Sequence, residues 1–153
     1  MRPNTLKTLA REGRVAVNAW VSMGSSYLAE ILGHAGFDAV TIDLQHGAYG
    51  FDTAVQLLHA VSSTPAIPLA RSAGGTLAEI NKLLDAGAYG VICPLIETVD
   101  EAAAFAAACR YPPRGVRSYG PARGLTYGGM DYPQHADDHV LSLAMIETIP
   151  ALE

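Results

Sequence analysis

Two stretches of the sequence, HAGFDAV at residues 34–40 and DAGAYGV at residues 85–91, follow the same pattern. Each has a glycine at the end of a predicted helix, then a short link, then the apolar residues of a buried strand. A helix-to-strand junction that recurs along a chain is typical of βα units with parallel strands and right-handed crossovers. The two stretches therefore predict an α/β protein.

The alternation continues on both sides of these stretches. Short β-branched runs predict strands at residues 15–21, 38–43, 67–71, 90–96 and 141–147. Apolar residues at helical spacing predict helices at residues 26–36, 51–63, 76–87 and 100–110, and Pro150 is in position to begin another. Thr76 and Glu79 have the spacing of a capping box. Residues 111–139, rich in Gly, Pro, Arg and Tyr, predict a long irregular segment.

Two architectures fit this order, an open doubly wound sheet and a (β/α)₈ TIM barrel. The 153 residues suit an open sheet of five strands, whereas a complete barrel needs about 250. The placement of polar residues favours the barrel, because nearly every strand carries them at its C-terminal end. They are Trp20 and Ser22 near the end of the first strand, and Asp43, Arg71 and Glu147 at the ends of later ones. An open sheet would gather them at one switch point. We therefore expect residues 1–153 to form a single incomplete barrel domain of about five βα units, with the C-terminal units missing.

The composition excludes several classes of protein. Hydrophobic residues make up 50% of the chain and charged residues 16%, which is the reverse of a disordered chain. The longest apolar run, residues 102–109, is far shorter than a membrane span needs. We expect no membrane span and no secretory leader. Cys93 and Cys109 have no zinc-binding or CxxC spacing, so we expect free thiols and a cytoplasmic location.

The net charge of −5 argues against nucleic acid as a partner. Arg110, Arg114, Arg117 and Arg123 form a local basic stretch, which we interpret as a solvated loop that helps to close an anionic pocket. The glycine-rich residues 119–129 lack the pattern of a phosphate-binding loop, and we interpret them as a flexible wall. His135 and His139 lie between polar residues, which favours solvated loop histidines over a metal pair.

Three strand ends carry candidates for chemistry. Asp43 and His46 lie three residues apart and can share a small site, although a histidine there can equally serve only its own loop. Arg71 suits a carboxylate or a developing oxyanion, with a structural ion pair as the alternative. Glu147 can bind a hard divalent ion or simply begin a helix. The only lysines, Lys7 and Lys82, do not follow strands, which disfavours Schiff-base chemistry.

The strand that holds Trp20 and five further stretches carry a resemblance to a known family. The five stretches are AGFDAVTIDLQHG (35–47), PLARSAG (68–74), INKLLDAGAYGVICPLIETVDEA (80–102), RYPPRGVRSYGPARG (110–124) and MIETIPALE (145–153). In this order they resemble the HpcH/HpaI family of class II pyruvate aldolases, which includes 4-hydroxy-2-oxo-heptanedioate aldolases. The resemblance implies a homo-oligomeric TIM barrel that cleaves 4-hydroxy-2-oxo acids to pyruvate, or a similar 2-oxo acid, and an aldehyde. It also implies a divalent metal: Mg²⁺, Mn²⁺ or Co²⁺.

The resemblance also implies roles for individual residues. His46 would be the acid/base, Arg71 would hold the 2-oxo oxygen and stabilise the enolate, and Glu147 would be one metal ligand. Trp20, Gln45 and Arg71 would contact the substrate. Each role is chemically reasonable, because an imidazole moves protons near neutral pH and a guanidinium meets negative charge where it develops.

Asp43 and Asp85 match the family's acidic partners in the hydrogen-bond network of the histidine. Asp85 ends the helix predicted at 76–87, so it lies at the bottom of its own barrel, far from His46 at the top. We therefore expect Asp85 to reach the His46 of a neighbouring subunit.

The chain departs from the family pattern at three places. Gln45 stands where the family commonly has Glu, and Met145 stands where many members have Gln. The family's second metal carboxylate comes from a strand beyond Glu153. Two alternatives therefore stay open: a non-catalytic fragment that folds as an open five-stranded sheet, and a lyase of the citrate-lyase β-subunit type.

Overall fold

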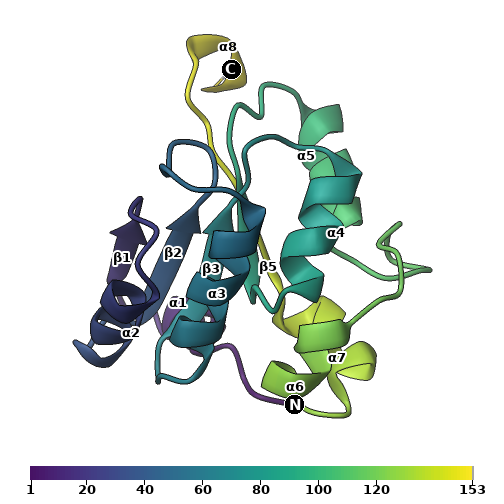
Figure 1. Ribbon diagram of the computed structural model, residues 1–153. Coiled ribbons are helices and arrows are strands. Elements are labelled where there is room, and N and C mark those ends of the chain that lie inside the picture. The colour runs from purple at the N-terminus through teal and green to yellow at the C-terminus, as the bar shows by residue number, and fades with distance from the viewer. Residues whose placement is uncertain (153) are drawn as a thin grey trace.

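A parallel sheet of five strands forms the centre of the molecule, as the computed structural model of residues 1–152 shows (Figure 1). The strands are β1 (Asn18–Val21), β2 (Ala39–Asp43), β3 (Ile67–Arg71), β4 (Gly90–Cys93) and β5 (Leu141–Ala144). Their order in the sheet is their order in the chain, and every neighbouring pair is parallel. A doubly wound sheet would reverse its strand order at a switch point, and these five strands do not. The α/β prediction is confirmed, and closure into a barrel stays a prediction.

Helices occupy all the predicted positions and three more. The helices are α1 (Thr5–Arg11), α2 (Ser26–His34), α3 (Phe51–Ser62), α4 (Leu77–Asp85), α5 (Val99–Ala108), α6 (Ala122–Gly128), α7 (Tyr132–His139) and α8 (Ile149–Leu152). The prediction of one irregular segment over residues 111–139 is wrong where α6 and α7 form. These two helices are held by burial of Tyr127, Tyr132 and Ala136.

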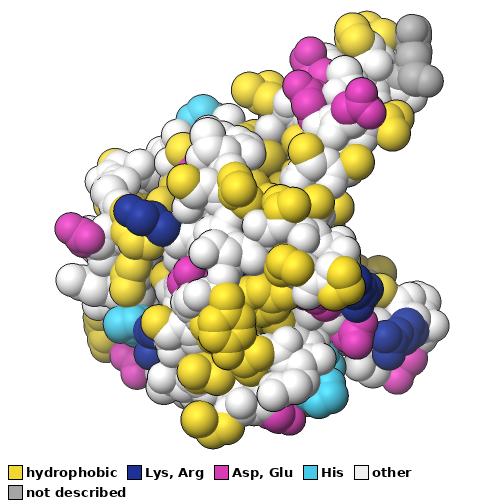
Figure 2. Space-filling model, turned by 90° about the vertical axis from the view of Figure 1, so that its right-hand side faces the viewer, with side chains coloured by type: hydrophobic (Ala, Val, Ile, Leu, Met, Phe, Trp, Pro, Cys, Tyr) yellow, Lys and Arg dark blue, Asp and Glu magenta, His cyan; other side chains and the backbone are white. Residues whose placement is uncertain are grey.

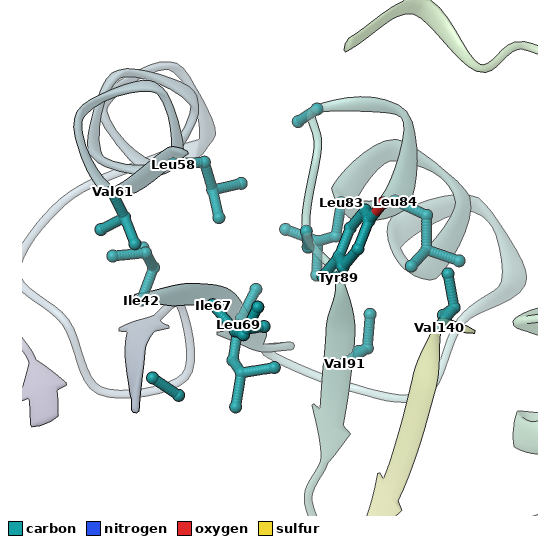
Figure 3. Close-up of a cluster of buried hydrophobic side chains, with 14 of the residues drawn as sticks. Ile42, Leu58, Val61, Ile67, Leu69, Leu83, Leu84, Tyr89, Val91 and Val140 are labelled. Carbon is teal, nitrogen blue, oxygen red and sulfur yellow. The ribbon is translucent and has the colours of Figure 1, made fainter. Parts of the chain in front are cut away.

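The main core lies between the sheet and the helices in front of it in Figure 1. Val40, Ile42, Ala70 and Val91 alternate along the strands and are fully buried on this side. The apolar stripes of α3 and α4 cover them, and Figure 3 shows part of this packing, with Leu58 and Val61 on α3 and Leu83 and Leu84 on α4. The helical spacing seen in the sequence therefore identifies the buried faces of these helices.

Glutamate carboxylates accept hydrogen bonds from main-chain N–H groups in the loops after β3 and β4. The side chain of Thr76 caps α4 by accepting from the Glu79 N–H, as predicted. The Glu79 carboxylate, however, accepts from the main-chain N–H groups of Ala73 and Gly74, so it anchors the loop after β3 instead of closing a capping box. The complete capping box lies at α5, between Thr98 and Glu101.

The opposite face of the sheet is only partly covered. Helix α1 lies behind the sheet in Figure 1, and between them is an apolar groove of about 500 Å³. The sheet lines it with Ala39, Leu69, Ile92, Leu141 and Leu143. Figure 2 shows the molecule hollowed at its right, below the projecting C-terminal segment.

No helix in residues 1–152 is long and apolar enough to cross a membrane.

The segment between α5 and α6 is held to the core by a buried charge. The side chain of Arg117 is 0% exposed, so the interpretation of this basic stretch as a solvated loop is wrong for that residue.

Two other expectations concern single side chains. His139 is not a solvated histidine, because its Nδ1 accepts a hydrogen bond from the main-chain N–H of Asn4. Cys93 and Cys109 are buried free thiols, and burial raises the pKa of both.

We predict that Leu83→Ala lowers the free energy of unfolding by about 2–5 kcal/mol, because it removes a fully buried side chain and leaves a cavity. Leu77→Ala in the same helix is the matched control, since Leu77 is 46% exposed. Its expected loss is about 0.5 kcal/mol or less. Urea denaturation of both variants measures the difference, and equal losses would contradict this assignment of the buried face.

Candidate active site

The candidate site lies at the carboxyl ends of neighbouring strands. Asp43 is the last residue of β2, Arg71 is the last residue of β3, and the strand register places them side by side. Trp20 comes from the adjacent strand β1, where it pairs with Thr41, two residues before Asp43 and therefore on the same face as Asp43. Residues paired in a parallel sheet point to the same face, so the three side chains lie together on the face that the groove lines.

Asp43 is the centre of this cluster. Arg71 donates from Nε to Oδ1 at 2.9 Å and from Nη2 to Oδ2 at 2.7 Å, which is a bidentate ion pair. The Trp20 indole and the Ser22 hydroxyl both donate to Oδ2, at 3.1 and 3.2 Å. The Arg71 guanidinium also lies 4.9 Å from the centre of the Trp20 ring. Arg71 is thereby fixed from two sides.

The same carboxylate organises the loop after β2. The main-chain N–H groups of Gln45 and His46 donate to Asp43 Oδ1, at 3.1 and 3.2 Å. The Tyr49 hydroxyl accepts from the Asp43 N–H and donates to the carbonyl of Val21, which joins the loop to β1. The loop conformation and the position of Arg71 therefore depend on one side chain.

These contacts determine the charge state of the pair. Burial alone would raise the pKa of Asp43, whose side chain is 1% exposed. Hydrogen bonds from Arg71, Trp20 and the His46 main chain outweigh burial and hold that pKa well below its usual range. The hydrogen bond to Asp43 raises the pKa of Arg71, and the nearby charge of Glu147 adds to the effect. The pair is ionised across the neutral pH range.

His46 lies beside the cluster but is joined to it only through its main chain. Its side chain is exposed, and its ring makes no hydrogen bond to Asp43 within residues 1–152. Both Asp43 oxygens already accept bonds from other groups. The structure therefore joins the predicted pair Asp43 and His46 through the main chain of His46, and the imidazole is exposed.

Gln45 has an unsatisfied group in the same loop. Its Oε1 atom is buried and has no hydrogen-bond partner among the described residues. A buried acceptor without a partner costs about 1–3 kcal/mol, so such an atom calls for an explanation. A donor from a bound molecule or from water would remove this cost.

Glu147 follows β5 and is the single predicted metal ligand of the chain. Its Oε2 accepts from the main-chain N–H of Leu95 at 2.8 Å, and Leu95 has a left-handed backbone with φ of 55°. No group of three or more His, Cys, Asp or Glu residues that could hold a metal ion exists within residues 1–152. These residues do not fit a complete metal centre, since they offer one carboxylate where several ligands are needed.

Asp85 lies apart from the cluster. It is the last residue of α4, at the end of the sheet opposite to Asp43, and it accepts from Arg117 at 3.0 Å. Tyr49, Leu95 and Arg117 are the contacts that sequence reasoning missed. Tyr49 and Leu95 act on neighbouring loops through main-chain groups, for which the sequence has no signal, whereas Arg117 was visible only as one of four arginines.

The cluster is an open edge rather than an enclosed pocket. Two cavities, of about 510 and 500 Å³, lie against α1 and not at the cluster. Trp20 is 43% exposed, although it contacts both Asp43 and Arg71. The chemistry of the polar cluster therefore locates the candidate site better than cavity size does.

Comparison with known proteins gives the family of the chain. The model of the HpcH/HpaI aldolase/citrate lyase family matches residues 17–153. A solved structure from that family, from Burkholderia cenocepacia J2315, is 30% identical and superposes with a TM-score of 0.87, covering 97% of this chain and 62% of that one. The chain belongs to the HpcH/HpaI aldolase/citrate lyase family.

Two curated relatives are aldolases. The chain is 41% identical over 149 residues to a hydroxypyruvate/pyruvate aldolase of Rhizorhabdus wittichii, covering 97% of this chain and 59% of the relative. It is 36% identical over 152 residues to a 4-hydroxy-2-oxo-heptane-1,7-dioate aldolase of Salmonella dublin, covering 97% and 58%. The chain thus spans a little over half the length of the curated relatives it matches.

We predict that the Asp43–Arg71 pair makes the fold acid-sensitive. Because the pKa of Asp43 is lower in the folded state, its contribution to stability is complete above the ordinary aspartate value of about 3.9 and is lost as the pH falls below it. Asp43→Asn is expected to be less stable at pH 7 and to lose less on acidification. Urea denaturation at pH 7 and pH 3.5 measures this.

Asp138→Asn is the control for this experiment, since Asp138 forms an exposed pair with Arg114. It is expected to change stability little at either pH, because exposed ion pairs contribute little. An acid sensitivity in Asp43→Asn equal to that of the wild type would contradict the prediction.

Proposed function

We propose that this chain carries the acid/base and enolate-stabilising residues of an aldolase, a carbon–carbon lyase that cleaves 4-hydroxy-2-oxo acids to pyruvate, or a similar 2-oxo acid, and an aldehyde. The observation that carries the proposal is Arg71, held by Asp43 and Trp20 at the carboxyl edge of the sheet. The names of the relatives support the reaction and the substrate class.

Arg71 would stabilise the charge that develops in the reaction. When the bond between C3 and C4 breaks, its electron pair moves into an enolate whose negative charge resides on the 2-oxo oxygen. Nε and Nη2 of Arg71 donate to Asp43, so Nη1 would be the group that donates to the 2-oxo oxygen. A preorganised cation at a developing oxyanion lowers the barrier because it needs no rearrangement during the reaction.

His46 would move the protons. It accepts the proton of the 4-hydroxyl group as the C3–C4 bond breaks and the aldehyde forms, and C3 of the enolate is protonated to give the 2-oxo acid. The exposed imidazole, on a loop fixed by Asp43, suits this role. Trp20 and Gln45 would contact the substrate, and the unsatisfied Oε1 of Gln45 supports such a contact.

Two acidic residues would assist the histidine. Asp43 fixes its loop from within the same chain, and Asp85 would reach the His46 of a second copy in a homo-oligomer. The location of Asp85 at the far end of α4 supports a contact between copies rather than within one.

A divalent metal, Mg²⁺, Mn²⁺ or Co²⁺, is part of the proposal through the family. When bound, such an ion would supply Lewis acidity to the 2-oxo acid. Glu147 would be one ligand, and no step of the reaction is assigned to the ion because the described residues do not fit a complete site.

The remaining parts of the proposal concern the whole protein. We propose that residues 1–153 are a single incomplete TIM barrel domain, in line with the sequential strand order and the 57–59% of the relatives' length that the chain spans. A cytoplasmic location agrees with two free cysteines. A non-catalytic fragment is the outcome if no activity is found.

A citrate-lyase or citrate-synthase type of reaction is the second candidate. The family description includes citrate lyase, and a solved citrate synthase, SbnG, is 28% identical with a TM-score of 0.83 over 96% of this chain. Turnover that depends on acyl-CoA or on citrate, without cleavage of 4-hydroxy-2-oxo acids, would favour this second reaction.

We predict that the chain releases pyruvate from a 4-hydroxy-2-oxo acid at millimolar Mg²⁺ or Mn²⁺, alone or fused to the C-terminal part of the Rhizorhabdus wittichii relative. Arg71→Ala is expected to lower kcat about 10²- to 10³-fold, because it removes the oxyanion contact. A coupled lactate dehydrogenase assay measures the release. Arg114→Ala, an exposed arginine far from the cluster, is the control with unchanged activity. Absence of release from both proteins would refute the proposed function.

We predict weak metal binding by the chain alone, because Glu147 is a single carboxylate. Isothermal titration with Mn²⁺ is expected to give no binding tighter than the millimolar range. The fusion protein, titrated in parallel, is expected to bind more tightly, and Glu147→Gln is expected to abolish that gain. A tight, Glu147-dependent site in the chain alone would show the prediction to be wrong.

A further inference from the structure

Arg117 is a buried cation at the end of the sheet opposite to the candidate active site. Its Nη2 donates to Asp85 Oδ1 at 3.0 Å, and its Nη1 donates to the hydroxyl of Tyr132 at 2.9 Å. The guanidinium also packs on the ring of Tyr111, 4.4 Å from the ring centre. The side chain belongs to the segment between α5 and α6 and reaches inward across the end of α4.

Stability alone is a poor explanation for this arrangement. Burying a guanidinium and a carboxylate costs several kcal/mol in lost hydration, and an apolar side chain of similar size is often as stable or more so. Arg117 Nε is buried without a hydrogen-bond partner among the described residues, which adds to the cost. The arginine therefore calls for a role beyond packing.

The Asp85 carboxylate is fixed in one orientation. Arg117 holds Oδ1, and a Cβ atom at Gly120 would lie only 3.2 Å from Oδ2, so the backbone closely approaches the second oxygen. The Ser118 N–H donates to the side chain of Asn81 at 2.7 Å, which ties the segment to α4. Oδ2 accepts no hydrogen bond within residues 1–152, although the side chain is 29% exposed. One oxygen is thus held and the other is free.

The surroundings of Asp85 suit contact with another protein surface. Val116 and Tyr119, on the same segment, are exposed hydrophobic residues. Figure 2 faces this side of the molecule, and hydrophobic side chains gather on it. A free carboxylate oxygen near such residues is suited to accept one hydrogen bond from a docked partner.

We propose that Arg117 is a positioning residue, which clamps Oδ1 of Asp85 so that Oδ2 accepts a hydrogen bond from the His46 imidazole of a second copy. This inference rests on the proposed function, in which Asp85 serves the histidine of another subunit. Arg117 itself touches neither substrate nor His46. It acts at a distance from the reaction, through the orientation and the charge of one carboxylate.

The charge of Asp85 depends on the same contact. Burial raises the pKa of Asp85, and the hydrogen bond and charge of Arg117 oppose that rise. Tyr111 and Tyr132 also face the pair, and burial raises the pKa of both phenols, so both are neutral at physiological pH. Without Arg117, the carboxyl would lose the cation that donates to it and would protonate at higher pH.

A double-mutant cycle tests the inference in the assembled enzyme. The variants are Arg117→Met, Asp85→Asn and the double variant, with kcat/KM for pyruvate release measured from pH 5 to pH 9. Arg117→Met is expected to lose about 10- to 100-fold, as is typical when a group that orients a reacting residue is removed. In the Asp85→Asn background, the same change is expected to have no further effect. Arg117→Lys is expected to recover part of the loss and part of the wild-type pH profile.

An Arg117→Met loss of equal size in the Asp85→Asn background would overturn the inference, because the arginine would then act independently of Asp85. An unchanged kcat/KM in Arg117→Met would overturn it as well. Thermal unfolding of each variant identifies those that fail to fold. Arg117→Lys then stands in for an unfolded Arg117→Met, with the same cycle against Asp85→Asn.

A complementation experiment tests the contact between copies. Arg117→Met chains mixed with His46→Ala chains are expected to regain activity, since some sites then combine an intact His46 with a correctly held Asp85. Arg117→Met chains mixed with Asp85→Asn chains are expected to stay inactive. The reverse pattern would overturn the inference.

A direct titration separates this inference from the proposed function. Carboxyl ¹³C NMR of the wild type and of Arg117→Met reports the Asp85 titration without any activity. A higher Asp85 pKa in Arg117→Met is expected, and an unchanged value would overturn the positioning role. A wild type that releases no pyruvate would instead refute the proposed function, whatever the titration gives.

Discussion

The bidentate ion pair between Asp43 and Arg71 is the interaction on which the candidate site depends. It joins the ends of β2 and β3. The Asp43 carboxylate also accepts a hydrogen bond from the Trp20 indole of β1. It also fixes the following loop through two main-chain N–H groups. A buried carboxylate with so many donors is held in a single charge state and a single orientation. The groups around it are therefore placed before any ligand arrives.

Two ion pairs, each with one buried partner, lie at opposite ends of the sheet. Asp43 and Arg71 occupy the carboxyl ends of the strands, whereas Asp85 and Arg117 lie at the end of α4. Neither pair is needed to fill the apolar core, which lies between them. In both pairs an arginine donates hydrogen bonds to a carboxylate, and one polar atom of the pair makes no hydrogen bond to the other residue. That atom is Nη1 of Arg71 in the first pair and Oδ2 of Asp85 in the second, and each can bind a further group.

The sequence predicts the features that depend on local patterns. Alternation and helical spacing locate β1 to β5 and α2 to α5, and polar residues after apolar strands identify Asp43 and Arg71. Features that depend on contacts between residues far apart in the sequence are not predicted. Helices α6 and α7 form because Tyr127 and Tyr132 become buried, and Arg117 is drawn inward by Asp85, 32 residues away in sequence. The second half of the Thr76 capping box fails for the same reason, because Glu79 finds better donors in the loop after β3.

The sequential strand order has a consequence for how the chain acquires its structure during synthesis. Asp43 and Arg71 are 28 residues apart, and Trp20 is 23 residues from Asp43. The described partners of the Asp43 carboxylate all lie within the first 71 residues, in β1 and β3 and in the loops after β1 and β2. Because domains form from the N-terminus as the chain emerges and short-range contacts form fastest, this cluster can assemble while the later strands are still being translated. Each later βα unit then adds to an edge whose polar end is already in place.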